Sequence, residues 1–78
     1  MAVGTFNYQN ASGYSERIEN PAEYQNYNLI VGNGLVDNQT SATVTLYSDL
    51  DGRGDSDYLY PNSSRYLSRG YRSFKFTS

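Results

Sequence analysis

Short segments in which apolar and polar residues alternate are the main pattern of this 78-residue chain. Two of them, 44–47 and 73–76, are also rich in β-branched or aromatic residues, which is typical of half-buried strands. Residues 29–31, an unbroken apolar run, predict a more deeply buried strand that is closed by the turn-forming sequence Gly-Asn-Gly at 32–34. No segment carries apolar residues at helical spacing for about three turns, so the pattern predicts an all-β chain.

The predicted strands and turns repeat along the chain. Short strands are predicted at 17–18 and 58–60, and after each of them a proline begins a polar connection. The repeated order indicates two four-strand units, the first at about 1–43 and the second at about 44–78. We therefore expect one all-β domain that spans 1–78.

A spaced motif marks the same repeat. Glycine is needed where a folded hairpin has positive φ, an aromatic ring can cover the fold, and a serine hydroxyl can cap the bend. The motif therefore predicts a folded hairpin in each unit. Each copy is an aromatic residue, six residues, a glycine, one residue and a serine, namely Phe6, Gly13 and Ser15 in the first and Tyr47, Gly54 and Ser56 in the second.

Composition restricts the chemistry that the chain can perform. Cysteine and histidine are both absent, which excludes disulfides, ordinary zinc sites and Ser-His or Cys-His nucleophilic catalysis. We therefore expect a non-enzymatic protein. Nine tyrosines are present, so the apolar area of a core must come largely from aromatic rings.

Charge and hydropathy argue against two classes of partner. The net charge of −2 gives no electrostatic footprint for nucleic acid or anionic lipid. No apolar run approaches the roughly 20 residues that span a bilayer, so we expect a soluble chain without nucleic-acid or membrane partners. Acids crowd 49–57 and bases follow at 65–75, which predicts a solvated acidic loop facing a basic strand.

The two copies of the spaced motif resemble the signature of the βγ-crystallins, most closely from Val44 to Tyr60. The resemblance covers nearly the whole chain. It implies a single microbial-type βγ-crystallin domain, a β-sandwich of two Greek-key motifs. In microbial members it also implies two calcium sites, each with a hydroxyl and a backbone carbonyl from one motif and an acidic or amide side chain and a hairpin carbonyl from the other.

Calcium-binding members of this family carry two Asn/Asp, two variable residues, Ser/Thr and Ser before the last strand of each motif. Segment 36–41 is similar to this pattern and is followed by the strand-like residues 42–44. The resemblance implies Asp37, Asn38 and Thr40 as calcium ligands, a choice that suits the preference of calcium for oxygen.

The second motif departs from the calcium pattern. Segment 68–73 keeps only the final serine, because Arg69 stands where an acid or amide is expected and Arg72 where the ligand hydroxyl should be. A guanidinium cannot ligate a cation. We therefore expect weak or partly lost calcium binding, with the arginines paired instead to Asp37 or to the acids of 49–57.

The acidic segment itself fails as an EF-hand loop. Counted from Asp49, the fifth position is Arg53 and the twelfth is Tyr60, where that loop needs oxygen ligands. Clustered carboxylates still bind calcium weakly, so Asp49 is a further candidate ligand.

Two alternatives to a structural calcium-binding module remain open. Microbial relatives of this fold look like proteinase inhibitors or killer toxins, which would imply a protein partner bound by the 49–57 hairpin or by a tyrosine and arginine surface. Residues 52–56 are also identical to the cell-attachment sequence recognised by integrins, with Arg53, Gly54 and Asp55 as the binding residues.

Overall fold

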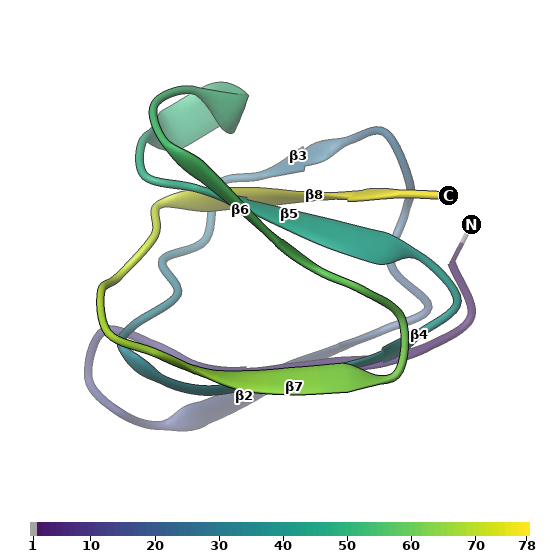
Figure 1. Cartoon of the computed structure of the whole chain (residues 1–78), viewed down its shortest axis with the longest axis horizontal. Helices are drawn as coiled ribbons and strands as arrows, with labels where there is room; N and C mark the ends of the chain where they lie inside the picture. Colours follow the sequence, from purple (N-terminus) through teal and green to yellow (C-terminus); the bar gives the residue numbers. More distant parts are fainter. Residues whose placement is uncertain (1) are drawn as a thin grey trace.

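The computed structural model describes residues 2–78, which form a β-sandwich of two antiparallel four-stranded sheets (Figure 1). The first sheet has the order β2-β1-β4-β7 and the second the order β3-β8-β5-β6. The all-β prediction is confirmed, as are strands at 17–18, 44–47 and 73–76. The elements are β1 (Gly4–Gln9), β2 (Ser15–Glu19), β3 (Asn26–Tyr27), β4 (Gly34–Thr40), β5 (Thr43–Tyr47), the 3-10 turn η1 (Leu50–Gly52), β6 (Ser56–Leu59), β7 (Ser63–Leu67) and β8 (Ser73–Thr77).

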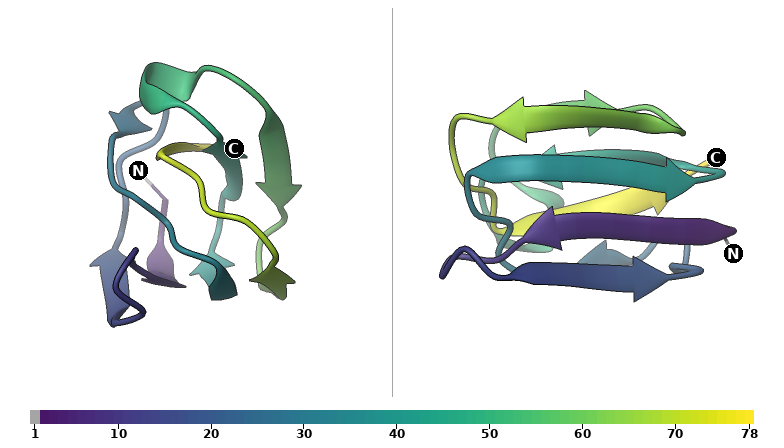
Figure 2. Two further views of the ribbon diagram at one scale, coloured as in Figure 1. Left: turned by 90° about the vertical axis from the view of Figure 1, so that its left-hand side faces the viewer. Right: turned by 90° about the horizontal axis from the view of Figure 1, so that it is seen from below.

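The two halves of the chain exchange one strand. β7 comes from the second half but pairs with β4 in the first sheet, and β3 comes from the first half but pairs with β8 in the second. Figure 2 (right) shows β2, β1, β4 and β7 side by side. Neither half therefore completes a sheet without the other.

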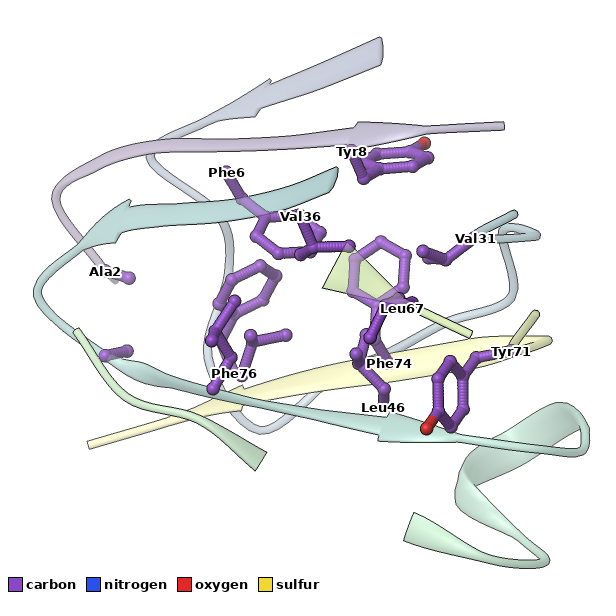
Figure 3. Close-up of a cluster of buried hydrophobic side chains, with 13 residues drawn as sticks. Ala2, Phe6, Tyr8, Val31, Val36, Leu46, Leu67, Tyr71, Phe74 and Phe76 are labelled. Carbon is purple, nitrogen blue, oxygen red and sulfur yellow. The ribbon is translucent and has the colours of Figure 1, made fainter. Parts of the chain in front are cut away.

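Aromatic rings form the centre of the core between the sheets (Figure 3). Phe6, Phe74 and Phe76 are fully buried, with ring centroids 5.2–5.8 Å apart. Tyr8 packs against this group from β1 and Tyr27 stacks on Phe74 from β3. The alternation of 73–76 thus places its two phenylalanines on the inward face, as side chains of a strand alternate between faces.

The β1–β2 and β5–β6 hairpins share a glycine and a serine. Gly13 and Gly54 have φ values of 84° and 82°, and each lies two residues before the serine that begins the next strand. A side chain is disfavoured at such φ. On Gly54 a Cβ would also collide with Ser48 Oγ, whereas on Gly13 it would meet nothing. These positions of the spaced motif are equivalent in the two hairpins.

The aromatic position of the motif is not equivalent. Tyr47 pairs with the serine of its hairpin, and in the first hairpin the serine pairs with Gln9, so Gln9 is the counterpart of Tyr47. Phe6 lies in the core instead. The prediction of a repeated aromatic position is therefore wrong. The connection of the second hairpin (48–55) is longer than that of the first (10–14), so residues at equal distances before the glycine are not equivalent in the two hairpins.

The predicted strand at 29–31 is also wrong. Only Val31 pairs, through an isolated bridge in which its peptide N–H and C=O bond to those of Tyr71 at 2.9 and 2.8 Å. Val31 is buried, but Leu29 and Ile30 are 43% and 54% exposed. The segment is a loop that touches its counterpart at one residue, so its apolar run does not mark a buried strand.

Candidate functional site

The end of the sandwich away from the chain termini carries the loops in which most of the candidate chemistry lies (Figure 1; Figure 2, left, looks onto this end). Two of its loops meet at the bridge between Val31 and Tyr71. We call this region the loop end, and it consists of residues 10–14, 28–33, 48–55 and 68–72.

Asp49 is used within the longer hairpin. Its Oδ1 accepts a hydrogen bond from the N–H of Leu50 (2.8 Å) and so caps η1. Its peptide oxygen accepts from Ser73 Oγ at 2.6 Å, and the same hydroxyl accepts from the N–H of Gly52 at 3.1 Å. Ser73, the final serine of the family pattern, therefore fastens this hairpin to β8.

The other three predicted calcium ligands do not lie in a loop. Segment 36–41 forms the end of β4 and the turn after it, so the expectation that it precedes the last strand of its motif is wrong. Asp37 accepts a hydrogen bond from Gln39 Nε2 (2.7 Å). It lies in the first sheet, whereas Asp49 lies in the loop that follows β5 of the second sheet. The structure does not bring Asp37, Asn38 and Thr40 together with Asp49.

Asn38 and Thr40 are buried and hydrogen-bonded to the protein. Asn38 Nδ2 donates to the peptide oxygens of Ala42 (2.8 Å) and Leu59 (3.0 Å). Its Oδ1 accepts from Thr40 Oγ1 at 2.6 Å. Because Leu59 belongs to β6, these bonds connect the two sheets, and they account for the polarity of both side chains.

A pair of ionic contacts joins β6 to β7 and the following loop. Arg65 contacts the Asp57 carboxylate at 2.9 Å, and the Tyr71 hydroxyl donates to the same carboxylate at 3.4 Å. Arg69 contacts Asp55 at 3.6 Å and lies over the Tyr71 ring, 5.4 Å from its centroid. The expected pairing of Arg69 with the acidic segment is thus present. Burial and then the negative charge of Asp57 raise the pKa of Tyr71.

The integrin-type sequence lies at the exposed tip of the longer hairpin. Gly54 supplies the positive φ of the bend, and Arg53 is exposed. The Asp55 carboxylate is exposed too, but it is already in contact with Arg69.

A cleft of about 420 Å³ opens between the first hairpin and the loop before β4. Residues 10–12 and 28–30 line it, together with Tyr8 and Glu16. Tyr8 is only 5% exposed, and within residues 2–78 its hydroxyl has no hydrogen-bond partner. Burial and then the charge of Glu16 raise the pKa of this phenol.

The cleft was not anticipated from the sequence, whereas the contact between Arg65 and Asp57 agrees with the prediction that the acids of 49–57 face the bases of 65–75. Tyr8 and Glu16 are directly opposite in the β1–β2 ladder, so they share a face. That pairing follows from the register of the β1–β2 hairpin. The spaced motif concealed this register, because it treated Phe6 and not Gln9 as the counterpart of Tyr47.

A comparison with family models, curated proteins and solved structures finds no match for this chain. Between residues 2 and 78 the structure has no group of three or more acidic side chains arranged to hold a metal ion. The same residues include no helix with the length and apolar character that crossing a membrane requires.

Proposed function

We propose that this chain is a non-enzymatic domain of the βγ-crystallin type, a structural module that has lost both calcium sites of that family. The strand order supports the Greek-key assignment. In each half the fourth strand lies beside the first (β4 beside β1, β8 beside β5), and the third strand crosses to the other sheet.

The two loops that would hold calcium make equivalent backbone hydrogen bonds, so their residues can be matched one to one. Val31 and Tyr71 pair with one another, and the next residues, Gly32 and Arg72, donate their peptide N–H to the last residues of β1 and β5 (2.7 and 2.9 Å). Gly32 is therefore the counterpart of Arg72, which stands where the resemblance places a ligand hydroxyl. Neither residue has a hydroxyl.

Of the two Asn/Asp positions in the family pattern, the first is kept in the first loop as Asn28, whose amide is hydrogen-bonded to Asp51. The second, acidic or amide, position is lost in both loops. It falls two residues before the bridge, on Leu29 in the first loop and on Arg69 in the second. A hydroxyl cannot be restored at Gly32, because a Cβ there would collide with the peptide oxygen of Asn10. The absence of a side-chain oxygen at all four of these positions is the observation that carries the proposal.

Calcium titration of the unmodified chain tests the proposal. A ligand that binds only the folded state raises its stability, by about 1.4 kcal/mol at a tenfold excess over Kd. We expect no change in melting temperature and no heat of binding at about 1 mM calcium, a concentration that occupies weak extracellular modules. Two calcium ions bound per chain would contradict the proposal.

A gain of binding tests the site register. In Leu29→Asp/Arg72→Ser both substitutions fall on exposed residues that the Val31–Tyr71 bridge brings together. We expect this variant to gain calcium-dependent thermal stability. Leu35→Asp/Arg17→Ser makes the same chemical changes on exposed residues of the first sheet and should gain none. An equal response of the two variants would show that the loops are not the family's calcium loops.

The structure gives unequal support to the two alternatives. Adhesion through Arg53, Gly54 and Asp55 needs a free carboxylate, whereas Asp55 is in contact with Arg69. An inhibitor or toxin-like protein needs a surface that binds another protein, and the loop end offers one.

A further inference from the structure

The polar groups of the cleft at the loop end are not equally available to a ligand. Asn28 is engaged by Asp51, to which its amide donates (2.9 Å) and from whose N–H it accepts (3.0 Å). Asn10 Oδ1 accepts from the N–H groups of Ser12 (2.9 Å) and Tyr14 (3.1 Å). The Tyr8 and Ser12 hydroxyls and the Glu16 carboxylate make no hydrogen bond to residues 2–78, and Glu16 is the only one of the three that carries a charge.

The Tyr8 side chain is largely buried, but its hydroxyl oxygen remains accessible at the cleft and makes no hydrogen bond to residues 2–78. In Figure 3 its oxygen points out of the core toward the side on which Val31 lies. A hydroxyl that lines a cleft without a protein partner is available to accept a hydrogen bond from a ligand. A ligand N–H that donates to this oxygen would give it the partner that residues 2–78 do not supply.

Glu16 gives the cleft its charge. Within residues 2–78 no arginine or lysine contacts its carboxylate, and the nearest arginine in the sequence, Arg17, is paired with Glu19 at 3.4 Å. The lining contains no basic residue. The cleft is therefore complementary to a cation.

Leu29 and Ile30 supply an apolar wall. Both are partly exposed, and they line the same cleft as Glu16. Lysine and arginine combine an apolar stem with a cationic head that only donates hydrogen bonds, which matches an apolar wall beside a carboxylate and a phenol oxygen.

We propose that this cleft docks the side chain of a lysine or arginine on a partner protein, with the stem against Leu29 and Ile30 and the head between Glu16 and the Tyr8 hydroxyl. A protein is the occupant because apolar surface continues beyond the cleft. Tyr14, on the hairpin that forms one wall of the cleft, is 72% exposed, and exposed tyrosine is typical of protein interfaces. The proposal rests on the protein-binding alternative, and it does not depend on the calcium sites.

Amide chemical shifts of the labelled chain can follow binding of a blocked pentapeptide with a central lysine between alanines. We expect shifts confined to residues 10–12, 16 and 28–30. The same peptide with norleucine in place of lysine should bind at least several-fold more weakly. Free butylammonium should also bind more weakly, because it lacks the peptide's contacts outside the cleft. Equal binding of the norleucine peptide, or of butylammonium, would overturn the proposal.

Variants assign the effect to the two polar groups. Glu16→Gln should weaken binding roughly threefold to fivefold, as expected for a partly exposed ion pair. Glu19→Gln removes the same charge from the same strand outside the cleft and should leave binding unchanged. Tyr8→Phe should weaken binding roughly threefold to tenfold. Should that variant fail to fold, Leu29→Ser at an exposed position takes its place, with a weakening expected. Equal losses in Glu16→Gln and Glu19→Gln would refute the docking site.

Discussion

Asn38 is an amide at a position that is aromatic in the other sheet. It lies opposite Phe6 in β1, and the corresponding residue opposite Val44 in β5 is Phe76. The amide replaces ring packing with hydrogen bonds to peptide oxygens, including that of Leu59 in the other sheet. Its burial is favourable only because every one of these groups is paired.

Asn38→Ala should therefore be strongly destabilising. It removes the Asn38 donor from the peptide oxygens of Leu59 and Ala42, of which only Ala42 also accepts from Thr40 Oγ1 (3.1 Å), and it opens a cavity, so we expect a loss of about 2–4 kcal/mol in the free energy of unfolding. Asp37→Ala is the matched control, because it is the next residue and its carboxylate bonds only to a neighbouring side chain. Its cost should stay below about 0.5 kcal/mol. Urea denaturation measures both, and similar losses would contradict the structural role of Asn38.

At the scale of elements, the two open sides of the sandwich are closed by different chemistry. On one side Tyr27 of β3 stacks on Phe74 at 5.4 Å and its hydroxyl accepts from the N–H of Ala22 (2.8 Å). On the other side the corresponding position is Arg65 of β7. Arg65 pairs with Val36 in the ladder as Tyr27 pairs with Phe74, and Val36 is the counterpart of Phe74.

Arg65 also covers an edge strand. β6 is the last strand of its sheet, and the peptide oxygen of Tyr58 accepts from Arg65 Nη2 at 2.8 Å. The N–H of Tyr58 donates to Asp57 Oδ1 at 2.9 Å. Both groups that this residue could offer to another strand are therefore occupied, which is a known protection of sheet edges by inward-pointing charges. In Figure 1, β6 and β7 form the near side of the molecule.

Arg65→Ala should reduce stability and expose the edge. The side chains of Arg65 and Asp57 are 42% and 39% exposed, so solvent weakens their ion pair. We expect the variant to lose about 1 kcal/mol in the free energy of unfolding, including the lost hydrogen bond to Tyr58. Arg17→Ala removes a pair that is 67% and 64% exposed and should cost nearly nothing. Light scattering should show concentration-dependent association of the Arg65 variant alone. Equal association of Arg65→Ala and Arg17→Ala would show that Arg65 does not protect the edge of β6.

Local patterns in the sequence predicted the elements that depend on local residues. The alternation at 44–47 and 73–76 identified β5 and β8, because the apolar residues at 44, 46, 74 and 76 lie on the strand faces that form the core. The run at 29–31 misled, because its exposure is set by a contact with Tyr71 far along the chain. The pattern that resembles the family's was likewise read at 36–41, although the segment whose backbone contacts correspond to those of 68–73 is 28–33. An insertion in one hairpin and the pairing of distant loops leave no local signal.

At the scale of the whole molecule, one core supports both halves. The chain is short and has no disulfide, so folding depends on a core in which aromatic rings are the largest side chains. Two of its rings carry hydroxyls at the loop end, Tyr8 from the first half and Tyr71 from the second. Burial of both phenols makes the stability of the whole domain sensitive to high pH.

The sign of this dependence follows from the raised pKa of each phenol. Burial acts first on both, reinforced by Glu16 at Tyr8 and by Asp57 at Tyr71, while Arg69 and Arg65 partly oppose the shift at Tyr71. Above pH ~10 the unfolded chain loses these phenolic protons while the folded chain retains them, so the unfolded state binds fewer protons and stability falls as pH rises. Below that pH both states are protonated and this contribution is constant.

We therefore expect the free energy of unfolding to decline from about pH 10 upward. In Tyr8→Phe/Tyr71→Phe the free energy of unfolding should decline less over the same range, since phenylalanine has no proton to lose. Tyr66→Phe, on an exposed ring, should follow the unmodified chain. Urea denaturation across this pH range compares the three proteins, and an alkaline decline of equal steepness in all of them would show that neither buried phenol contributes to it.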